Sequence, residues 1–197
     1  MKKVLIIMLA HNAYNHLVDS VKQTWCKNLP ENYKLILNYG NGNKNYTYQI
    51  EDRVYSPFQE NQSNIISKTF DIFNFVKDWN FDYILRCCCG TYINLNILNQ
   101  IIEILPSSNC YWGLPLKYED VNYATGSCYL ISKDLIPVIL KNKNICKTII
   151  DDVNASYNII RKVFPNAFSV DEIAGVGLHP VSIKLLQRGV LKNVNKS

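Results

Sequence analysis

No apolar run in this sequence is long enough to cross a lipid bilayer. The run near the N-terminus, Val4–Ala10, has seven residues, whereas a membrane-spanning helix needs about 20. Polar residues follow this run without the small-x-small pattern of a signal-peptide cleavage site. We therefore expect a buried first strand here, no transmembrane segment and a cytoplasmic location.

Clusters of basic residues are also absent. The 21 Lys and Arg residues are scattered along the chain with 16 Asp and Glu residues and give a net charge of +5. Proteins that bind nucleic acid usually gather basic side chains on one face, so we expect no nucleic-acid partner. A small anionic substrate explains the modest positive charge equally well. A Gly-rich phosphate-binding loop is missing too, which argues against an unrelated nucleotide-binding α/β protein.

The seven cysteines fit neither a disulfide framework nor a zinc-binding CxxC pattern. Their number is odd, and three of them, Cys87–Cys89, are consecutive. Disulfide bonds persist mainly in oxidising compartments. Reduced thiols in the cytoplasm therefore explain the composition better than disulfide bridges do.

What the sequence does contain is an alternation of apolar strands with amphipathic helices. This order predicts a single α/β domain spanning residues 1–197, with one mostly parallel sheet and helices on both faces. The expected strands are Lys3–Leu9, Lys34–Tyr39, Asp52–Ser56, Phe81–Cys89, Tyr111–Leu116, Ser127–Ile131 and Ala167–Val170, and the helices begin near Asn12 or Asn15, Ser63 or Asn64, Asn94, Lys133 and Asp151.

This type of sheet indicates where a ligand would bind. In open α/β sheets, ligands bind outside the carboxyl ends of the strands. The segments to examine are therefore Ala10–Asn15, Tyr39–Asn45, Cys87–Thr91 and Tyr118–Gly126.

Several segments, in the same order along the chain, are similar to motifs of one enzyme family. Val21–Trp25 reads V-K-Q-T-W, and Tyr83–Asn94 reads Y-I-L-R-C-C-C-G-T-Y-I-N after the segment Lys68-Thr69-Phe70. Ala124–Leu135 reads A-T-G-S-C-Y-L-I-S-K-D-L and precedes Asp151-Asp152-Val153. They resemble the (I/V)RxTW, YVLKTDDDVFVN, sGxGYvlSxdL and EDV motifs of the β-1,3-galactosyltransferase and Fringe family, and the resemblance covers nearly the whole chain.

The resemblance implies a GT-A fold and an inverting glycosyltransferase. Such an enzyme moves a hexose or an N-acetylhexosamine from a nucleotide sugar, here expected to be a UDP-sugar, to a hydroxyl of a glycan or glycoconjugate. In the family, a divalent cation held by an Asp-x-Asp motif neutralises the leaving diphosphate, and a carboxylate removes the proton of the attacking hydroxyl. The family usually works behind a membrane anchor, so the lack of one here suggests a virus or microbe that glycosylates in the cytosol.

The metal motif is where this sequence departs from the family. Its three acids fall on Cys88, Cys89 and Gly90, and thiols suit zinc or copper(I) better than magnesium or manganese. Adjacent strand residues point to opposite faces, so Cys88 and Cys89 are badly placed to share one ion, whereas Cys87 and Cys89 share a face. The cysteines are therefore small buried hydrophobes, a redox site or a metal site. We expect no metal cofactor.

Three functional outcomes stay open. In the first, the enzyme works without metal, and Arg86, Lys68 or Lys117 carries the phosphate charge. In the second, Glu119 or Asp120 supplies a replacement acid. In the third, the chain is a catalytically inactive, transferase-like module that binds a sugar or a partner.

The resemblance assigns the general base to Asp152, with Asp151 as the next candidate. A plainer role is also open, because acidic residues at the start of a helix cap it and interact favourably with its dipole. The two roles are compatible with each other.

The other candidate site residues come from the strand ends and from the family motifs. His11 is explained equally well as a polar cap on the strand end, and Trp112 as a core residue. The candidates for donor binding are His11, Asn12, Tyr39, Arg86, Cys88 and Gly90, and those for acceptor binding are Trp112, Gly126 and Tyr129.

Overall fold

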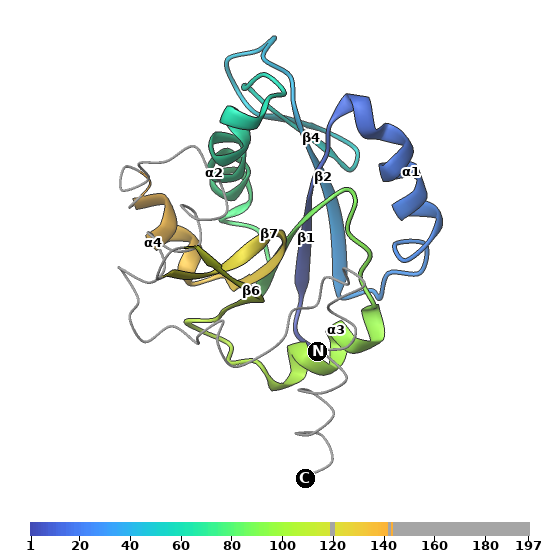
Figure 1. Cartoon of the computed structure of the whole chain (residues 1–197), viewed down its shortest axis with the longest axis vertical. Helices are drawn as coiled ribbons and strands as arrows, with labels where there is room; N and C mark the ends of the chain where they lie inside the picture. The colour runs from blue at the N-terminus through green and yellow to red at the C-terminus, as the bar shows by residue number, and fades with distance from the viewer. Residues whose placement is uncertain (119–120, 142, 144–197) are drawn as a thin grey trace.

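Seven strands form one sheet in the computed structural model, which describes residues 1–118, 121–141 and 143 (Figure 1). Their spatial order is β3-β4-β2-β1-β5-β7-β6. The strands are β1 (Val4–Leu9), β2 (Tyr33–Gly40), β3 (Tyr48–Ile50), β4 (Arg53–Ser56), β5 (Tyr83–Cys88), β6 (Tyr111–Tyr118) and β7 (Val121–Ser132).

The sheet is parallel at its centre and antiparallel at its edges. β1 pairs in parallel with both β2 and β5, and β2 pairs in parallel with β4. β3 and β7 run antiparallel to their neighbours, so five of the seven strands run in one direction. The expected α/β class with a single sheet is confirmed. The sequence did not predict β3, and the expected helix at Asp151 and strand Ala167–Val170 lie outside the described residues.

The helices pack on both faces of the sheet. α1 (Asn15–Gln23) and α3 (Leu95–Ile104) cover one face, and α2 (Ile65–Val76) and α4 (Leu135–Lys141) cover the other (Figure 1). α2 is the longest of them, with 12 residues. Among the described residues, no helix combines the length and the apolar composition that a membrane span requires.

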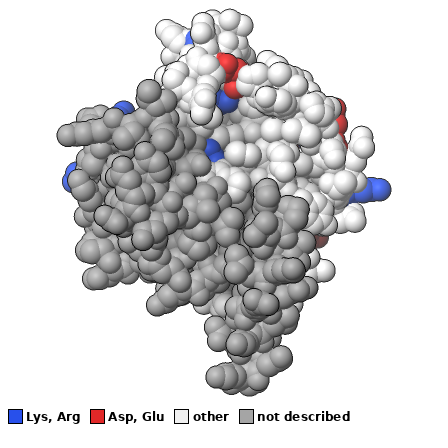
Figure 2. Space-filling view, viewed as in Figure 1, with Lys and Arg blue, Asp and Glu red and all other residues white. Residues whose placement is uncertain are grey.

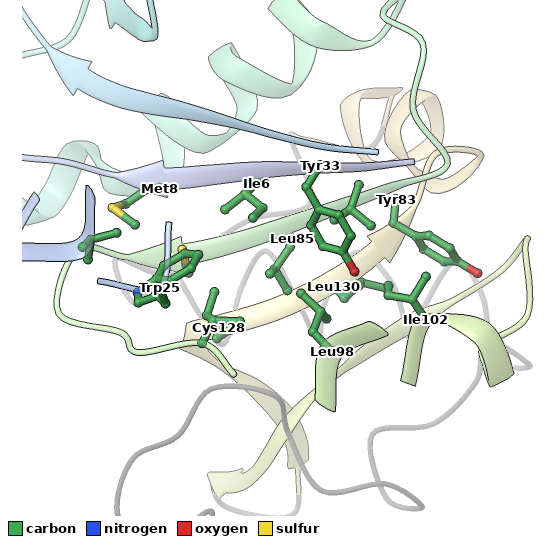
Figure 3. Close-up of a cluster of buried hydrophobic side chains, with 14 of the residues drawn as sticks. Ile6, Met8, Trp25, Tyr33, Tyr83, Leu85, Leu98, Ile102, Cys128 and Leu130 are labelled. Carbon is green, nitrogen blue, oxygen red and sulfur yellow. The ribbon is translucent and has the colours of Figure 1, made fainter. Parts of the chain in front are cut away.

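Alternation along the central strand produces two hydrophobic cores. Ile6 and Met8 of β1 belong to the core under α1 and α3, whereas Leu5 and Ile7 belong to the core under α2 and α4, and all four are at most 2% exposed. Successive strand side chains point to opposite faces, so a strand buried on both sides reads as a continuous apolar run. Figure 3 shows the first core, with Ile6, Leu85, Leu98 and Leu130 between the sheet and α3, and Met8 on the side of Trp25.

The connections place a topological switch point between β1 and β5. The chain passes from β1 through α1 to β2 on one side, and from β4 through α2 to β5 on the other side. Because α1 and α2 lie on opposite faces, a crevice opens where the two connections diverge, outside the carboxyl ends of β1 and β5. This edge carries Ala10 and Cys89, within two of the segments that the sequence selected.

α1 and α2 begin within one residue of the expected starts at Asn15 and Asn64, and a short 3-10 turn precedes each helix. Asn64 is the N-cap residue of α2, but its side chain makes no capping hydrogen bond. His11 caps the turn Asn12–Tyr14 by accepting a hydrogen bond at Nδ1 from the Ala13 N–H at 2.9 Å. Asn61 similarly caps the turn Gln62–Asn64 before α2. The expected cap at Asn94 is confirmed.

Replacing Asn94 with Ala is expected to lower the free energy of unfolding by about 1 kcal/mol. The Asn94 side-chain oxygen accepts hydrogen bonds from the backbone N–H groups of Asn96 at 3.1 Å and Ile97 at 3.2 Å, and both lose this partner. Urea unfolding measures the change. Asn96→Ala is the matched control, because Asn96 is exposed on the same helix. Equal destabilisation by the two substitutions would contradict the capping role.

Candidate functional site

A pocket of about 740 Å³ opens at the switch point between β1 and β5. The carboxyl ends of both strands, the chain that leads into α2, and the middle of β7 form its wall. Figure 2 shows that charged atoms are sparse on the described part of one face of the molecule, where basic and acidic atoms touch near the upper end. The pocket is lined by Leu9, Ala10, His11, Tyr14, Glu60, Asn61, Gln62, Ile65, Lys68, Arg86, Cys88, Cys89, Gly90, Thr91, Gly126 and Ser127.

Lys68 of α2 is a buried cation in this wall. Its side chain is only 4% exposed, and its Nζ lies 2.8 Å from Glu60 Oε2 and 3.3 Å from the Ala10 carbonyl oxygen. Burial lowers the pKa of Lys68 and nearby Arg86 lowers it further, while the hydrogen bond to Glu60 opposes the shift. The ammonium is therefore held by one carboxylate and one backbone carbonyl at the carboxyl end of β1.

Glu60 connects Lys68 to the carboxyl end of β2. Its Oε1 accepts a hydrogen bond from the Gly40 N–H. A Cβ added at Gly40 would lie 2.5 Å from the Phe58 carbonyl oxygen and 3.0 Å from Glu60 Cδ, so only glycine allows this close approach. Glu60 is the only acidic residue among the described lining residues of the pocket.

Arg86 of β5 is the second buried cation. It is 1% exposed and lies opposite Tyr129 of β7, whose ring centroid is 5.4 Å from the guanidinium carbon. Its Nη1 donates a hydrogen bond to the Gly126 carbonyl oxygen and lies 3.7 Å from Cys88 Sγ. Because Arg86 and Cys88 are two residues apart on one strand, both point to the same side of β5.

The turn after β5 is tied to two other elements. The Thr91 N–H donates to the Cys88 carbonyl oxygen at 3.1 Å, and the Thr91 hydroxyl donates to the Ser127 carbonyl oxygen at 2.7 Å. Trp25 Nε1, just beyond α1, donates to the Thr91 carbonyl oxygen at 3.2 Å. Trp25 therefore fixes the turn that carries Cys89 and Gly90, a role that the sequence motif did not reveal.

The side chains in this turn do not fit a magnesium or manganese ion. The Cys88 thiol donates to the Gly126 carbonyl oxygen at 3.2 Å, and a guanidinium nitrogen lies next to it. Burial raises the pKa of the Cys89 thiol, which disfavours the thiolate form that binds metals. No group of three His, Cys, Asp or Glu residues in the described part of the chain is arranged to hold an ion. Hard cations prefer several oxygen ligands, and this turn offers thiols beside a cation.

The structure brings together five of the nine candidate donor- and acceptor-binding residues. His11, Arg86, Cys88, Gly90 and Gly126 line the pocket. The four that do not line it are Asn12, Tyr39, Trp112 and Tyr129, and the catalytic candidates Asp151 and Asp152 lie outside the described residues.

Three of these four residues are buried in the two cores. Tyr39 is 1% exposed, and its hydroxyl donates to Asn15 Oδ1 at 2.8 Å. Trp112 is 1% exposed and belongs to the core under α1 and α3. This agrees with the alternative that the sequence left open, a core residue. Tyr129 lies beneath Arg86 and shapes the site through that contact. Asn12, in contrast, is exposed.

Sequence reasoning missed several lining residues. Tyr14 is half-exposed, and its ring centroid lies 5.3 Å from that of His11. Glu60 and Asn61 lie in the polar connection between β4 and α2, which none of the family motifs covers. Lys68 was not missed, because the sequence named it for the phosphate charge, and the structure places it with Arg86 in the pocket wall.

The fold is similar to that of a known glycosyltransferase. The apo-form glycosyltransferase GlyE of Streptococcus pneumoniae is similar in structure, with a TM-score of 0.52 and 11% sequence identity over 86% of this chain. The fold is a GT-A-like α/β fold, similar to that of this glycosyltransferase. The similarity covers 45% of GlyE. At 11% identity, this similarity shows the fold alone. It does not show that the chain belongs to the β-1,3-galactosyltransferase and Fringe family. No family model and no curated protein sequence matches the chain.

Replacing Glu60 with Ala is expected to lower the free energy of unfolding by about 3 kcal/mol, because it leaves the buried Lys68 ammonium without its carboxylate. Asp52→Ala is the matched control. It breaks the Lys22–Asp52 pair, whose side chains are 38% and 34% exposed, and should cost at most about 1 kcal/mol. Chemical denaturation at neutral pH compares the two variants. A Glu60→Ala effect as small as that of the control would show that the buried pair does not stabilise the fold.

Proposed function

We propose that the chain is a glycosyltransferase that moves a hexose or N-acetylhexosamine from a nucleotide sugar, most simply a UDP-sugar, to a hydroxyl of a glycan or glycoconjugate. The observation that carries the proposal is a pair of buried cations, Lys68 and Arg86, in the pocket at the switch point of a glycosyltransferase fold. The pocket volume of about 740 Å³ also falls within the range of roughly 300–1,000 Å³ that small-molecule sites have.

In the proposed reaction, the two cations bind the diphosphate without a metal ion. Departure of the nucleoside diphosphate develops negative charge on the phosphate oxygens, and fixed positive groups in a water-poor site stabilise that charge strongly. A guanidinium pairs with two phosphate oxygens at once. A bound diphosphate also adds a second anion near Lys68, which favours the charged form of this lysine.

The rings of His11 and Tyr14 are proposed to bind the nucleoside part. They lie at the carboxyl end of β1, next to the cations, and Tyr14 is 50% exposed. A half-exposed ring beside a pocket offers a flat apolar surface to a base or a sugar. The base would then lie at the β1 end and the diphosphate between Lys68 and Arg86.

The proposed chemical step is a single inverting displacement. A carboxylate removes the proton of the acceptor hydroxyl, the oxygen attacks the anomeric carbon, and the bond from that carbon to the diphosphate breaks. Asp152 is the proposed base and Asp151 the next candidate, on the basis of the motif similarity. The absence of acids at Cys88, Cys89 and Gly90 favours the second candidate function, an inactive module that binds the donor without turnover.

The setting of the reaction is also a proposal. No disulfide joins the six described cysteines, which agrees with a reducing compartment. A cytoplasmic viral or microbial transferase, with a nucleotide-sugar donor and a glycan acceptor as its partners, is the setting that the sequence favours.

A UDP-sugar panel tests donor binding. At least one member should raise the melting temperature, since a ligand at 100 times its Kd stabilises by about 2.7 kcal/mol, and excess EDTA should leave this shift unchanged. The double variant Lys68→Met/Glu60→Gln removes one charge of each sign and should lose the shift. Lys22→Met/Asp52→Asn makes the same change at an exposed pair and should keep it. If no nucleotide sugar stabilises the protein, the proposed function is wrong.

The substitution Asp152→Asn distinguishes the two candidate functions, an active transferase and an inactive binding module. The substitution should abolish sugar transfer, measured by release of the nucleoside diphosphate in the presence of a glycan acceptor, and it should leave the donor-induced melting shift intact. Asp151→Asn is the neighbouring comparison and should reduce turnover less. Full turnover by the Asp152→Asn protein would exclude Asp152 as the base.

A further inference from the structure

The described cysteines differ sharply in their access to solvent. Cys87, Cys110 and Cys128 are at most 2% exposed and lie in the core under α1 and α3. Cys26, Cys88 and Cys89 are partly exposed. Of all six, Cys88 and Cys89 line the pocket, so a reagent that enters the pocket meets these two thiols.

Cys88 is the thiol that faces positive charge. Its Sγ lies 3.7 Å from Arg86 Nη1, and Lys68 belongs to the same pocket wall. The thiol proton points to the Gly126 carbonyl oxygen at 3.2 Å. A reagent that reaches this sulfur therefore lies next to the guanidinium, which attracts an anionic reagent.

The other five described thiols are held in their protonated form by burial. Burial raises the pKa of Cys26, Cys110 and Cys128 to about 12. It raises the pKa of Cys87 well above its usual range, and it also raises the pKa of Cys89. Cys26 is the informative comparison, because it is partly exposed like Cys88 but sits outside the pocket.

The charged residues of the pocket also favour reagents of negative charge. Lys68 and Arg86 both line it, against the single carboxylate of Glu60, and Glu60 is already paired with Lys68. A concave site whose described residues carry an excess of positive charge concentrates anionic ligands. An anionic reagent should therefore reach Cys88 more often than a neutral or cationic one.

We propose that Cys88 is a thiol-modification site, which forms a mixed disulfide with small anionic disulfides of the glutathione disulfide class. The Cys88 thiolate attacks one sulfur of the disulfide, the sulfur–sulfur bond breaks, and the second half leaves as a thiolate that takes up a proton. The exchange needs no other oxidant. The carboxylates of the attached half lie near Lys68 and Arg86, and the adduct fills the pocket.

This site does not depend on the proposed function. The modified protein would lose whatever anionic ligand the pocket binds, because the adduct occupies the same space and the same cations. Thiol chemistry at Cys88 can be detected by mass alone, so a protein that fails to bind any nucleotide sugar can still confirm it.

The test exposes the folded protein to glutathione disulfide, with peptide mass mapping over time. Cys88 should carry the first adduct, roughly 10-fold or more faster than Cys26. Cationic cystamine and neutral hydroxyethyl disulfide should react with Cys88 more slowly than glutathione disulfide does. Added salt should reduce this difference in rate between the three reagents. First modification at Cys26 or Cys89, or equal rates for the three reagents, would overturn the proposal.

Two variants provide the controls. Cys88→Ser should remove the fast adduct, whereas Cys26→Ser should keep it, and thermal melting verifies that both proteins are folded. Retention of the fast phase by Cys88→Ser would contradict the assignment. The wild-type mapping remains decisive if Cys88→Ser fails to fold.

Discussion

Strand β1 pairs in parallel with β5 along its whole length, from Val4 opposite Tyr83 to Leu9 opposite Cys88. The positions of all the lining residues depend on this register. It ends both strands at the same edge, so the Ala10 carbonyl that accepts from Lys68 and the Cys88 thiol come to lie in one pocket. A shift by one residue would turn Arg86 to the opposite face, under α1 and α3, and would remove the cation from the pocket. The two apolar cores make such a shift costly, because every side chain of the shifted strand would exchange its environment.

The buried cations weaken the fold where they lie. Moving an ammonium or a guanidinium out of water costs several kcal/mol, and pairing offsets this cost only in part. The same burial lowers the pKa of Lys68. Apolar residues of similar size would fill the same space without this cost. Residues that cost stability in this way tend to lie at functional sites, which is why Lys68 and Arg86 carry more weight in the proposed function than the exposed pair of Lys22 and Asp52 does.

The sequence predicted the parts of the molecule that depend on local patterns. Alternation and capping located β1, β5 and the Asn94 cap, because each follows from a few neighbouring residues. Tyr39 was assigned to the pocket from its place at a strand end, yet it lies two residues after Leu37 and therefore shares the core face of that residue. Glu60 could not be predicted, because its role depends on contacts with Gly40, 20 residues away, and with Lys68. The short strand β3 was hidden because its residues are largely polar or exposed.

The environment of Cys88-Cys89-Gly90 depends on Arg86, which lies two residues before Cys88 on the same face of β5. In the family that the sequence resembles, acids at these positions would hold a divalent cation. Here the Arg86 guanidinium lies beside the Cys88 thiol, at the position where the family motif carries a lysine. The motif combines this cation with neighbouring acids, whereas this chain has the cation without the acids. Lys68 is paired with Glu60, Arg86 is held by the Gly126 carbonyl oxygen, and a thiol at position 88 adds no negative charge beside them. In the proposed reaction, these two fixed cations face the diphosphate.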